Sequence, residues 1–480
     1  MTQARAMRTW FEETLEALEQ NRWTAPLYLV GGNGEDVTRQ TAVLSMLQAL
    51  QNNTSTRTLL FQNAVLDNQL QDVLVKTLQQ NQSLVNVTLR NLTIHRGNEA
   101  AAENHNANEN HRAAQPNFYA LPAALFASPT LRSVSLTCCR LDRVACQALA
   151  HALCSNHHSL DRLYLNHVAL DHASVVWDAL RRTKTLRSLT MRDMPGDMHS
   201  LWHCLAHNSS LESLSMERLS DVSPSQPSND EQQPPSFNHQ LAHNIAYLFQ
   251  HSTTLRNLSL RENCLTAAAL EHICGQANNC HLQSLYLSHN PLGPTGARVL
   301  MGWLQSTCIS DICLALTGLG PEGCQTVARH LPNCPRLRRL NLDGNQMEDC
   351  GPAFATALQT SYNVVSLFDY LPKLIDKGLS PQLAEWEQVH LLLRANRCQR
   401  RFFGQIDNRN EEALVPHVLA QASSDPDVLF SFVQGLGRPL TTTNQMTMTA
   451  GVLPHGFSSS GQKSHVVQQQ KPRPRVAPSA

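Results

Sequence analysis

A short leucine pattern recurs along most of this chain and restricts its fold more than any other feature. In "LQSLYLSHNPL", which begins at Leu282, large apolar residues stand three and then two positions apart, and Asn290 follows. Clear copies begin at Leu131, Leu160, Leu186, Leu211, Leu255, Leu282, Ile309 and Leu337. Further copies begin at Leu84, more loosely at Thr24 and Thr56, and in degraded form at Val364. About twelve units, most of them roughly 27 residues apart, predict a solenoid.

Each unit predicts a short strand followed by a helix. The pattern L-x-x-L-x-L places apolar side chains on one face of a strand and polar ones on the other. In the following "GARVLMGWLQS", apolar residues recur at steps of three and four, which is typical of a helix. Gly293 and Gly296 fit the turn into that helix, and Asn263, Asn290 and Asn345 can bond turn backbone groups that otherwise lack a partner. Because a helix is bulkier than a strand, we expect a curved stack with parallel strands on its concave face and helices on its convex face.

This pattern resembles the ribonuclease-inhibitor-like leucine-rich repeat family, and the resemblance covers roughly residues 24–370. It implies an α/β fold, a curved horseshoe-like solenoid, and says little about activity. Residues 1–23 predict an N-terminal capping helix, because Trp10, Phe11 and Leu15 would share one face. We expect a cap because the first unit of a stack otherwise leaves its core exposed.

Two polar insertions interrupt the regular spacing of the repeats. They span residues 96–115 and 221–239. Both are typical of loops, since they contain too little apolar surface to form a core of their own. We therefore place them between repeats rather than in separate domains.

The pattern changes after the last repeat. Residues 371–436 predict a helical C-terminal cap, with Leu383, Trp386 and Val389 on a broad apolar face that can cover the open end of the stack. The combination of "LRANRCQRRFF" with "VPHVLAQASSDPDVLFSFVQG" resembles a segment that follows such arrays in proteins of diatoms and related algae, and it implies no known activity. Residues 437–480 predict a disordered basic tail, in which "KPRPR" has the composition of a weak nuclear signal.

The composition argues against several kinds of partner. Lysine plus arginine equals aspartate plus glutamate, at 38 each, so no global field attracts nucleic acid or acidic lipid. There is no run of about 18 apolar residues, so we expect no transmembrane helix. Glu12 and Glu13 stand where a signal peptide needs apolar residues. The 14 cysteines show no CxxC pair and no zinc-like spacing, so we expect reduced thiols in a protein of the cytosol or nucleus.

Motifs that would carry chemistry are weak. "GFSSSGQKS" nearly forms a phosphate-binding loop, but Gln462 separates its second glycine from Lys463. "GGNG" at residues 31–34 lacks the third glycine of a dinucleotide motif. In "CCRLDRVACQALAHALCSNHH", Cys146 and Cys154 align with buried positions of other repeats, so core packing explains them better than zinc. We expect no enzyme activity, no catalytic or metal site, no cofactor and no small-molecule substrate.

The concave sheet is the surface on which we expect function, because a packed solenoid has no internal cleft. Its outward-facing residues form columns that include aromatic and arginine side chains, both enriched at interface hot spots. The predicted protein-binding residues are Tyr164, Asn166, Arg192, Glu217, Arg261, Tyr286 and Asp343. In the alternative interpretation, the face is simply solvated and tyrosine and arginine are good strand residues. If the face does bind, charge reversal at Arg192 together with Arg261 should abolish partner capture without unfolding the chain.

The sequence therefore favours a non-catalytic scaffold that captures one or more protein partners. The alternative is a regulator of enzymes, such as a GTPase-activating protein resembling that for Ran, but the basic tail departs from the acidic tail of that class. A sensor of the innate-immune type would need a nucleotide-binding module before the repeats, where only residues 1–23 stand. A ribonuclease-inhibitor role rests on the resemblance alone.

Overall fold

The computed structural model describes most of the repeat array and one helix beyond it. The described residues are 2–31, 37–94, 123–155, 160–194, 198–219, 237–277, 281–368 and 383–397. The chain divides into two compact units, Met1–Leu429 and Phe430–Ala480, and all described residues belong to the first. The predicted insertion 96–115 and the predicted tail 437–480 lie outside the described residues.

The described strands form one parallel sheet in which sequence order is also spatial order. The eleven strands are β1 (Leu27–Val30), β2 (Thr58–Leu66), β3 (Asn86–Ile94), β4 (Ser133–Leu141), β5 (Arg162–Leu170), β6 (Ser188–Arg192), β7 (Ser213–Glu217), β8 (Asn257–Ser259), β9 (Ser284–Tyr286), β10 (Asp311–Cys313) and β11 (Arg339–Asn341). The degraded last copy adds a single parallel bridge, between Ser366 and Arg339. This topology confirms the predicted α/β leucine-rich repeat solenoid.

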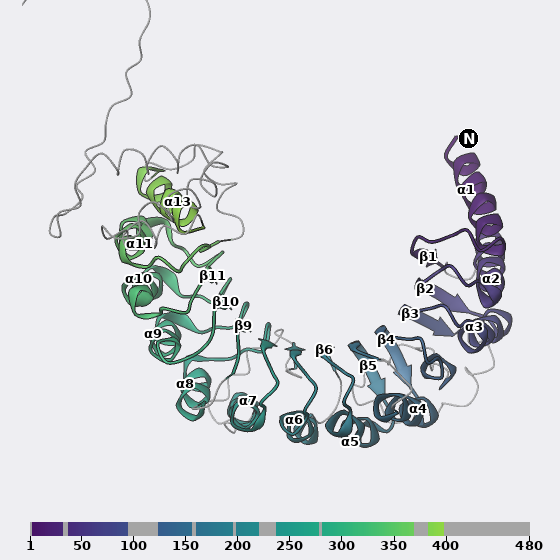
Figure 1. The fold of residues 1–480 in the computed structure, drawn as a ribbon, viewed down its shortest axis with the longest axis horizontal. Coiled ribbons are helices and arrows are strands. Elements are labelled where there is room, and N and C mark those ends of the chain that lie inside the picture. Colours follow the sequence, from purple (N-terminus) through teal and green to yellow (C-terminus); the bar gives the residue numbers. More distant parts are fainter. Residues whose placement is uncertain are drawn as a thin grey trace, which may run out of the picture. The chain divides into compact units, whose positions relative to one another are not determined.

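Helices alternate with the strands and lie on the outer side of the sheet, as Figure 1 shows for the first unit. They are α1 (Thr2–Glu19), α2 (Val37–Asn52), α3 (Asn68–Gln80), α4 (Arg143–Cys154), α5 (Ala173–Arg182), α6 (His199–Ala206), α7 (Phe237–His251), α8 (Ala267–Gln276), α9 (Gly293–Leu304), α10 (Gly320–His330), α11 (Gly351–Thr360) and α13 (Leu383–Arg397). Short 3₁₀ turns span Ala123–Phe126, Leu331–Asn333 and Glu348–Cys350. Because α7 already begins at Phe237, the last three residues of the predicted insertion 221–239 are helical.

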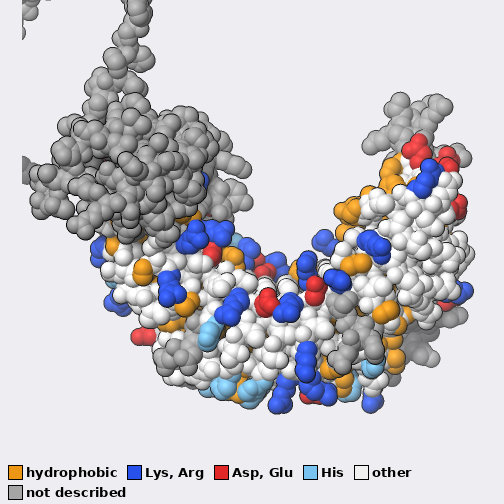
Figure 2. Space-filling model, in the orientation of Figure 1, with side chains coloured by type: hydrophobic (Ala, Val, Ile, Leu, Met, Phe, Trp, Pro, Cys, Tyr) orange, Lys and Arg blue, Asp and Glu red, His pale blue; other side chains and the backbone are white. Residues whose placement is uncertain are grey.

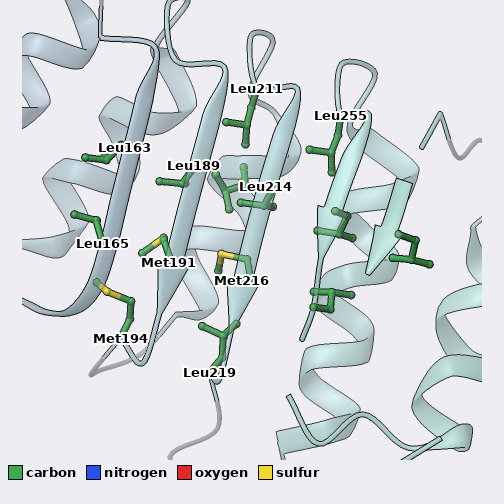
Figure 3. Packing of buried hydrophobic residues seen from close by; sticks show 14 of the residues in the cluster. Leu163, Leu165, Leu189, Met191, Met194, Leu211, Leu214, Met216, Leu219 and Leu255 are labelled. Atoms are coloured by element: carbon green, nitrogen blue, oxygen red, sulfur yellow. The ribbon is translucent and has the colours of Figure 1, made fainter. Parts of the chain in front are cut away.

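The core is continuous from repeat to repeat. Each strand sends two large apolar side chains inward, and in β5, β6 and β7 these are Leu163 and Leu165, Leu189 and Met191, and Leu214 and Met216, all buried. Figure 3 shows these pairs side by side on the helix side of the sheet. Burying one such side chain contributes about 1.5–3 kcal/mol, but a single repeat cannot cover its own flanks. Each unit is therefore stable only against its neighbours.

Asparagine side chains stabilise the turns in the C-terminal half of the array. The buried Asn290 amide donates to the carbonyls of Leu260 (2.9 Å) and Leu287 (2.8 Å). Its Oδ1 accepts from the backbone N–H groups of Asn263 (3.1 Å) and Leu265 (2.9 Å). Asn345 makes the equivalent set of bonds two repeats further on. These contacts confirm the role predicted for the asparagines.

In the N-terminal half, the backbone groups at the ends of the strands are bonded in a different way. The equivalent position there holds the apolar residues Ala64, Leu92, Cys139 and Val168. Strands β2 to β5 are each nine residues long. β2 pairs with β3, and β4 with β5, a second time beyond the turn, for example Ala64 with Leu92 and Cys139 with Val168. Strand pairing thus replaces the asparagine as the partner of the backbone, which the sequence analysis did not anticipate.

In every repeat from β2 to β11, a residue with positive φ directly precedes the position that Asn290 holds in its own repeat. These residues are Asn63, Asn91, Cys138, His167, Asp193, Arg218, Glu262, His289, Leu316 and Gly344. The left-handed conformation turns the chain away from the strand, at a cost for any residue with a side chain. It also adds one more column of side chains at the end of the strands.

Helices pack at both ends of the described array. Trp386 of α13 has its ring 6.1 Å from that of Phe354 in α11 and 5.6 Å from that of Phe368. Asn396 of α13 donates to the carbonyls of Ser361 (2.9 Å) and Val364 (2.7 Å). At the other end, α1 packs against α2. We propose that α1 and α13 cap the stack, since each covers the open flank of a terminal repeat.

Replacing Asn290 with alanine should destabilise the array strongly. The change removes the partners of several buried backbone groups at once, so we expect the free energy of unfolding to fall by about 3 kcal/mol. Chemical denaturation followed by circular dichroism measures the loss. Asn257→Ala on the neighbouring strand is the control, because this half-buried residue has no comparable bonds and its loss should cost less than about 0.5 kcal/mol. Equal losses in both variants would contradict the role given to Asn290.

Candidate interaction surface

The sheet register places in one row the outward residues that stand between the second and third apolar positions of each repeat pattern. Direct pairing joins Ser135, Tyr164, Thr190, Ser215, Ser259, Tyr286, Cys313 and Asn341. Their neighbours along each strand are buried, so these side chains face away from the core. Tyr286 is 39% exposed and Tyr164 is half-buried.

Two tyrosines border a stretch of small hydroxyl side chains on this row. Between Tyr164 on β5 and Tyr286 on β9, strands β6, β7 and β8 contribute Thr190, Ser215 and Ser259. We call these three residues the hydroxyl floor. At about 4.8 Å between strands, the tyrosine backbones are about 19 Å apart. A helix about 10–12 Å across or an extended segment fits between them.

The outward residues that follow the third apolar position of each repeat form a second column at the ends of the same strands. Asn166, Arg192 and Glu217 are direct partners on β5, β6 and β7. Arg261 follows β8, where its carbonyl accepts from the N–H of Arg218 (3.3 Å). The structure thus brings six of the seven predicted residues together on β5 to β9. Asp343 follows β11, two strands beyond Tyr286.

Arg192 is held in an ion-pair network rather than exposed to a partner. Its guanidinium lies 3.0 Å from Glu262, 3.7 Å from Glu217 and 3.9 Å from Asp193. Arg218 contacts Glu262 at 2.5 Å and Asp193 at 3.5 Å. We call these five residues the charge network. It joins two cations to three anions on β6, β7 and the turn after β8.

The network also orders the hydroxyl floor. One carboxylate oxygen of Glu217 accepts from Ser215 Oγ (2.8 Å) and from Ser259 Oγ (3.2 Å). The side chain of Glu217 is only 16% exposed and that of Arg192 29%. Side chains fixed in this way lose little rotamer freedom when a partner binds. The centre of the predicted site is therefore rigid, and both of its arginines are paired with carboxylates.

Glu262 is the acid on which the network converges. Burial alone would raise its pKa, but the hydrogen bond from Arg218 and the positive charges of Arg192, Arg218 and His289 outweigh burial, so the pKa lies below its usual value. The reciprocal hydrogen bond to Glu262 raises the pKa of Arg218. Glu262 therefore stays ionised at neutral pH.

Arg261 remains exposed beside the network. It forms no ion pair with any residue in the part of the chain that the structure describes. The predicted test by charge reversal at both Arg192 and Arg261 would also break the internal ion pairs of Arg192 and confuse binding with stability. Arg261 alone is the suitable arginine for such a test.

Sequence reasoning missed Asp193, Arg218 and Glu262. They occupy the positive-φ column, one residue beyond the two columns derived from the strand pattern. The available signal was charge alternation, because the adjacent columns read Arg192, Glu217, Arg261 and Asp193, Arg218, Glu262.

The cysteine-rich segment is only partly core, because Cys154, which the sequence analysis aligned with buried positions, is exposed. Cys139 and Cys146 are buried, and burial raises the pKa of Cys139 to about 12, so its thiol stays protonated. A protonated thiol is a poor metal ligand. Within the described ranges, no group of three or more His, Cys, Asp or Glu residues is placed to hold a metal ion. "GFSSSGQKS" and most of "GGNG" lie outside the described residues.

Histidines cluster on the helix side of the array, where Figure 2 shows them in pale blue. Tyr247 of α7 stacks on His251 at 4.1 Å and lies 4.5 Å from His203 of α6 between ring centroids. Its hydroxyl is 3.1 Å from His207 Nε2. Burial, followed by the charges of His251, Arg181 and His203, lowers the pKa of His207. His207 is also a direct ring neighbour of His203 (5.7 Å) and of His251 (5.5 Å), measured between ring centroids.

None of the helices that the structure describes has both the length and the apolar character needed to cross a bilayer.

Comparison with known proteins agrees with the repeat architecture. A family model described as "Leucine Rich repeat" matches residues 278–301, which include β9, Asn290 and most of α9. Among solved structures, the chain is similar to TLR13 in its complex with ssRNA13, with a TM-score of 0.37 and 13% identity over 67% of this chain and 36% of that chain. This chain thus spans little more than a third of that protein. No curated protein matches the sequence. The sheet topology, together with the family match over residues 278–301, supports a leucine-rich repeat fold for this chain.

Replacing Glu262 with glutamine should reduce stability at neutral pH and flatten its acid dependence. The pKa of Glu262 is lower in the folded chain than in the unfolded one, so its stabilisation is complete above pH 5 and is lost as the pH falls through the folded-state pKa. We expect a cost of about 1–2 kcal/mol at pH 7, and a smaller difference between parent and variant at pH 3.

Urea denaturation at both pH values measures this difference. Glu212→Gln is the matched control, since Glu212 forms an exposed pair with Arg187 at 2.5 Å. Such a pair contributes about 0–1 kcal/mol. A parent–variant difference at Glu262 that does not change between pH 7 and pH 3 would contradict the assigned role.

Proposed function

We propose that this chain is a non-catalytic scaffold that captures a protein partner on the hydroxyl floor and its two bordering tyrosines. The observation that carries the proposal is the position of Tyr164 and Tyr286 on opposite sides of a flat stretch of small side chains. Aromatic residues in such a setting supply large contact area with few rotatable bonds. A curved repeat sheet is a common platform for binding of this kind.

The physical basis for capture is a preorganised surface. The floor and the charge network are held by strand pairing and ion pairs, so binding requires little reordering. Arg261 offers a guanidinium that can form a forked pair with a carboxylate of the partner. We expect the interface to be polar and hydrated, with the tyrosines as its anchors.

The remaining features of the proposal are inferred from the sequence. We infer that the repeats are of the ribonuclease-inhibitor-like kind, supported by their spacing and by the alternation of strands and helices in the described part of the array. We place the protein in the cytosol or nucleus and expect neither a membrane nor a specific nucleic acid as its main partner. An enzyme-regulating role would use the same surface, and GTP hydrolysis by purified small GTPases with and without the chain tests it.

Truncating both bordering tyrosines should abolish partner capture. Proteins retained from native lysate by the parent chain are identified by mass spectrometry, and the retained partner is then purified and titrated against Tyr164→Ala/Tyr286→Ala by calorimetry. Loss of two aromatic anchors should weaken binding at least about 100-fold. Arg261→Glu should weaken it less, by about tenfold.

Tyr28→Ala provides the matched control. Tyr28 also faces outward from the sheet, on β1, and is 57% exposed, but it lies away from the floor. Its truncation should leave the affinity unchanged. Undiminished affinity in the Tyr164 and Tyr286 double variant, at unchanged melting temperature, would refute the proposed surface.

A further inference from the structure

A row of arginines runs along the edge of the sheet at which the strands begin. The residue just before each strand from β2 to β11 is joined to the next by a backbone hydrogen bond, in an unbroken ladder from Arg57 to Val365. Five members of this ladder are arginines: Arg57, Arg132, Arg187, Arg256 and Arg338. We call these five the arginine row. Figure 2 shows Lys and Arg side chains spread along the inner edge of the array.

Most of this positive charge is not neutralised within the described part of the chain. Arg187 pairs with Glu212, the next member of the ladder. The other four arginines form no ion pair with a described residue. Arg57 and Arg256 instead donate to the carbonyls of Ser83 (3.2 Å) and His281 (3.3 Å), which orients their guanidinium groups along the edge.

The opposite edge of the sheet has a different charge balance. There the charge network pairs each of its arginines with carboxylates. Among the described residues, unpaired positive charge at the edge where the strands begin therefore exceeds that at the opposite edge, where Arg261 also lacks an ion pair. That excess makes the edge complementary to an anionic ligand.

We propose that the arginine row binds an acidic, extended segment of the protein partner. This inference rests on the proposed function, because it describes a second contact made by the same partner. The row is continuous with the hydroxyl floor: the ladder residue of β5, Asp161, stands three residues before Tyr164. Three residues of strand span about 10 Å.

The spacing of the charges favours a peptide over a nucleic acid. Adjacent strands are about 4.8 Å apart, so Arg132 and Arg256 are about 19 Å apart, and Arg256 and Arg338 about 14 Å. Two carboxylates of this chain, Asp161 and Glu212, lie between Arg132 and Arg256. A nucleic acid would place phosphates in a continuous series against both carboxylates. An extended peptide, at about 3.3 Å per residue, can carry carboxylates four to six residues apart and leave the positions between them neutral.

Fluorescence anisotropy with the full-length chain tests this inference. The probe is a labelled peptide of glycine and serine with successive glutamates six and then four residues apart, so that they share one face, and it is compared with the same peptide carrying glutamine instead. Arg57→Gln/Arg132→Gln/Arg338→Gln should weaken binding of the acidic peptide at least about tenfold. Raising the salt concentration from 50 to 300 mM should also weaken binding of the acidic peptide by the parent chain.

The control variant is Arg143→Gln/Arg181→Gln/Arg298→Gln. It removes the same charge from exposed positions on α4, α5 and α9 and should bind the acidic peptide as the parent does. Equal binding of the glutamine peptide, or equal loss in the control variant, would overturn the inference. Tighter binding of a labelled oligothymidine of equal charge than of the acidic peptide would also overturn it, in favour of nucleic acid.

The outcome is separable from that of the proposed function. Tyr164→Ala/Tyr286→Ala should bind the acidic peptide as the parent does, because neither tyrosine belongs to the arginine row. If the peptide fails to bind while capture of the partner still depends on the tyrosines, only the inference about the arginine row is refuted. If capture does not depend on the tyrosines while the arginine row still binds the peptide, only the proposed role of the hydroxyl floor is refuted.

Discussion

The packing of each repeat against the next is the interaction on which the rest of this structure depends. The inward side chains of neighbouring strands, such as Leu189 with Leu163 and Leu214, lie in register and are almost completely buried. Because strand side chains alternate, fixing the inward set also fixes every outward residue. The hydroxyl floor, the charge network and the arginine row are thus consequences of core packing. A register shift by one residue would bury charges and expose leucines.

The same alternation explains how much of the surface the sequence could predict. The column containing Tyr164 and Tyr286 followed from the single residue between the second and third leucines of each repeat, and the strand pairs reproduce it residue by residue. The ion pairs of Arg192 did not follow, because Glu262 reaches it from a turn after β8 and through a left-handed residue. Strand periodicity says nothing about where a chain leaves the strand. The second pairing segments of β2 to β5 escaped prediction for the same reason.

Net charge was a poor guide to the surface. Equal numbers of acids and bases predicted no global field, yet acids concentrate on α1, at Glu12, Glu13 and Glu16, while arginines recur at the strand starts. When the same residue type recurs at one position of each repeat, its side chains form a row in which neighbouring strands are about 4.8 Å apart. Such a row is visible only when the repeats are aligned and each position is considered separately. Local charge, rather than the total, determines what a partner meets within a Debye length of about 8–10 Å.

The two edges of the sheet differ in charge, which favours one orientation of a partner on the proposed binding surface. At the strand ends, Arg192 and Arg218 are already paired with carboxylates, so an incoming acidic group gains little from these two arginines and must compete with Glu262. Arg261 is left to form a single pair with the partner at that edge. At the strand starts, Arg132 and Arg338 are exposed and unpaired among the described residues. A partner with one apolar and one acidic side can satisfy both the tyrosines and the arginine row in one orientation, and the reversed orientation would place its acids against the edge where two of the arginines are already paired. The rigid sheet that holds these features at fixed separations thereby gives the surface specificity for orientation as well as for charge.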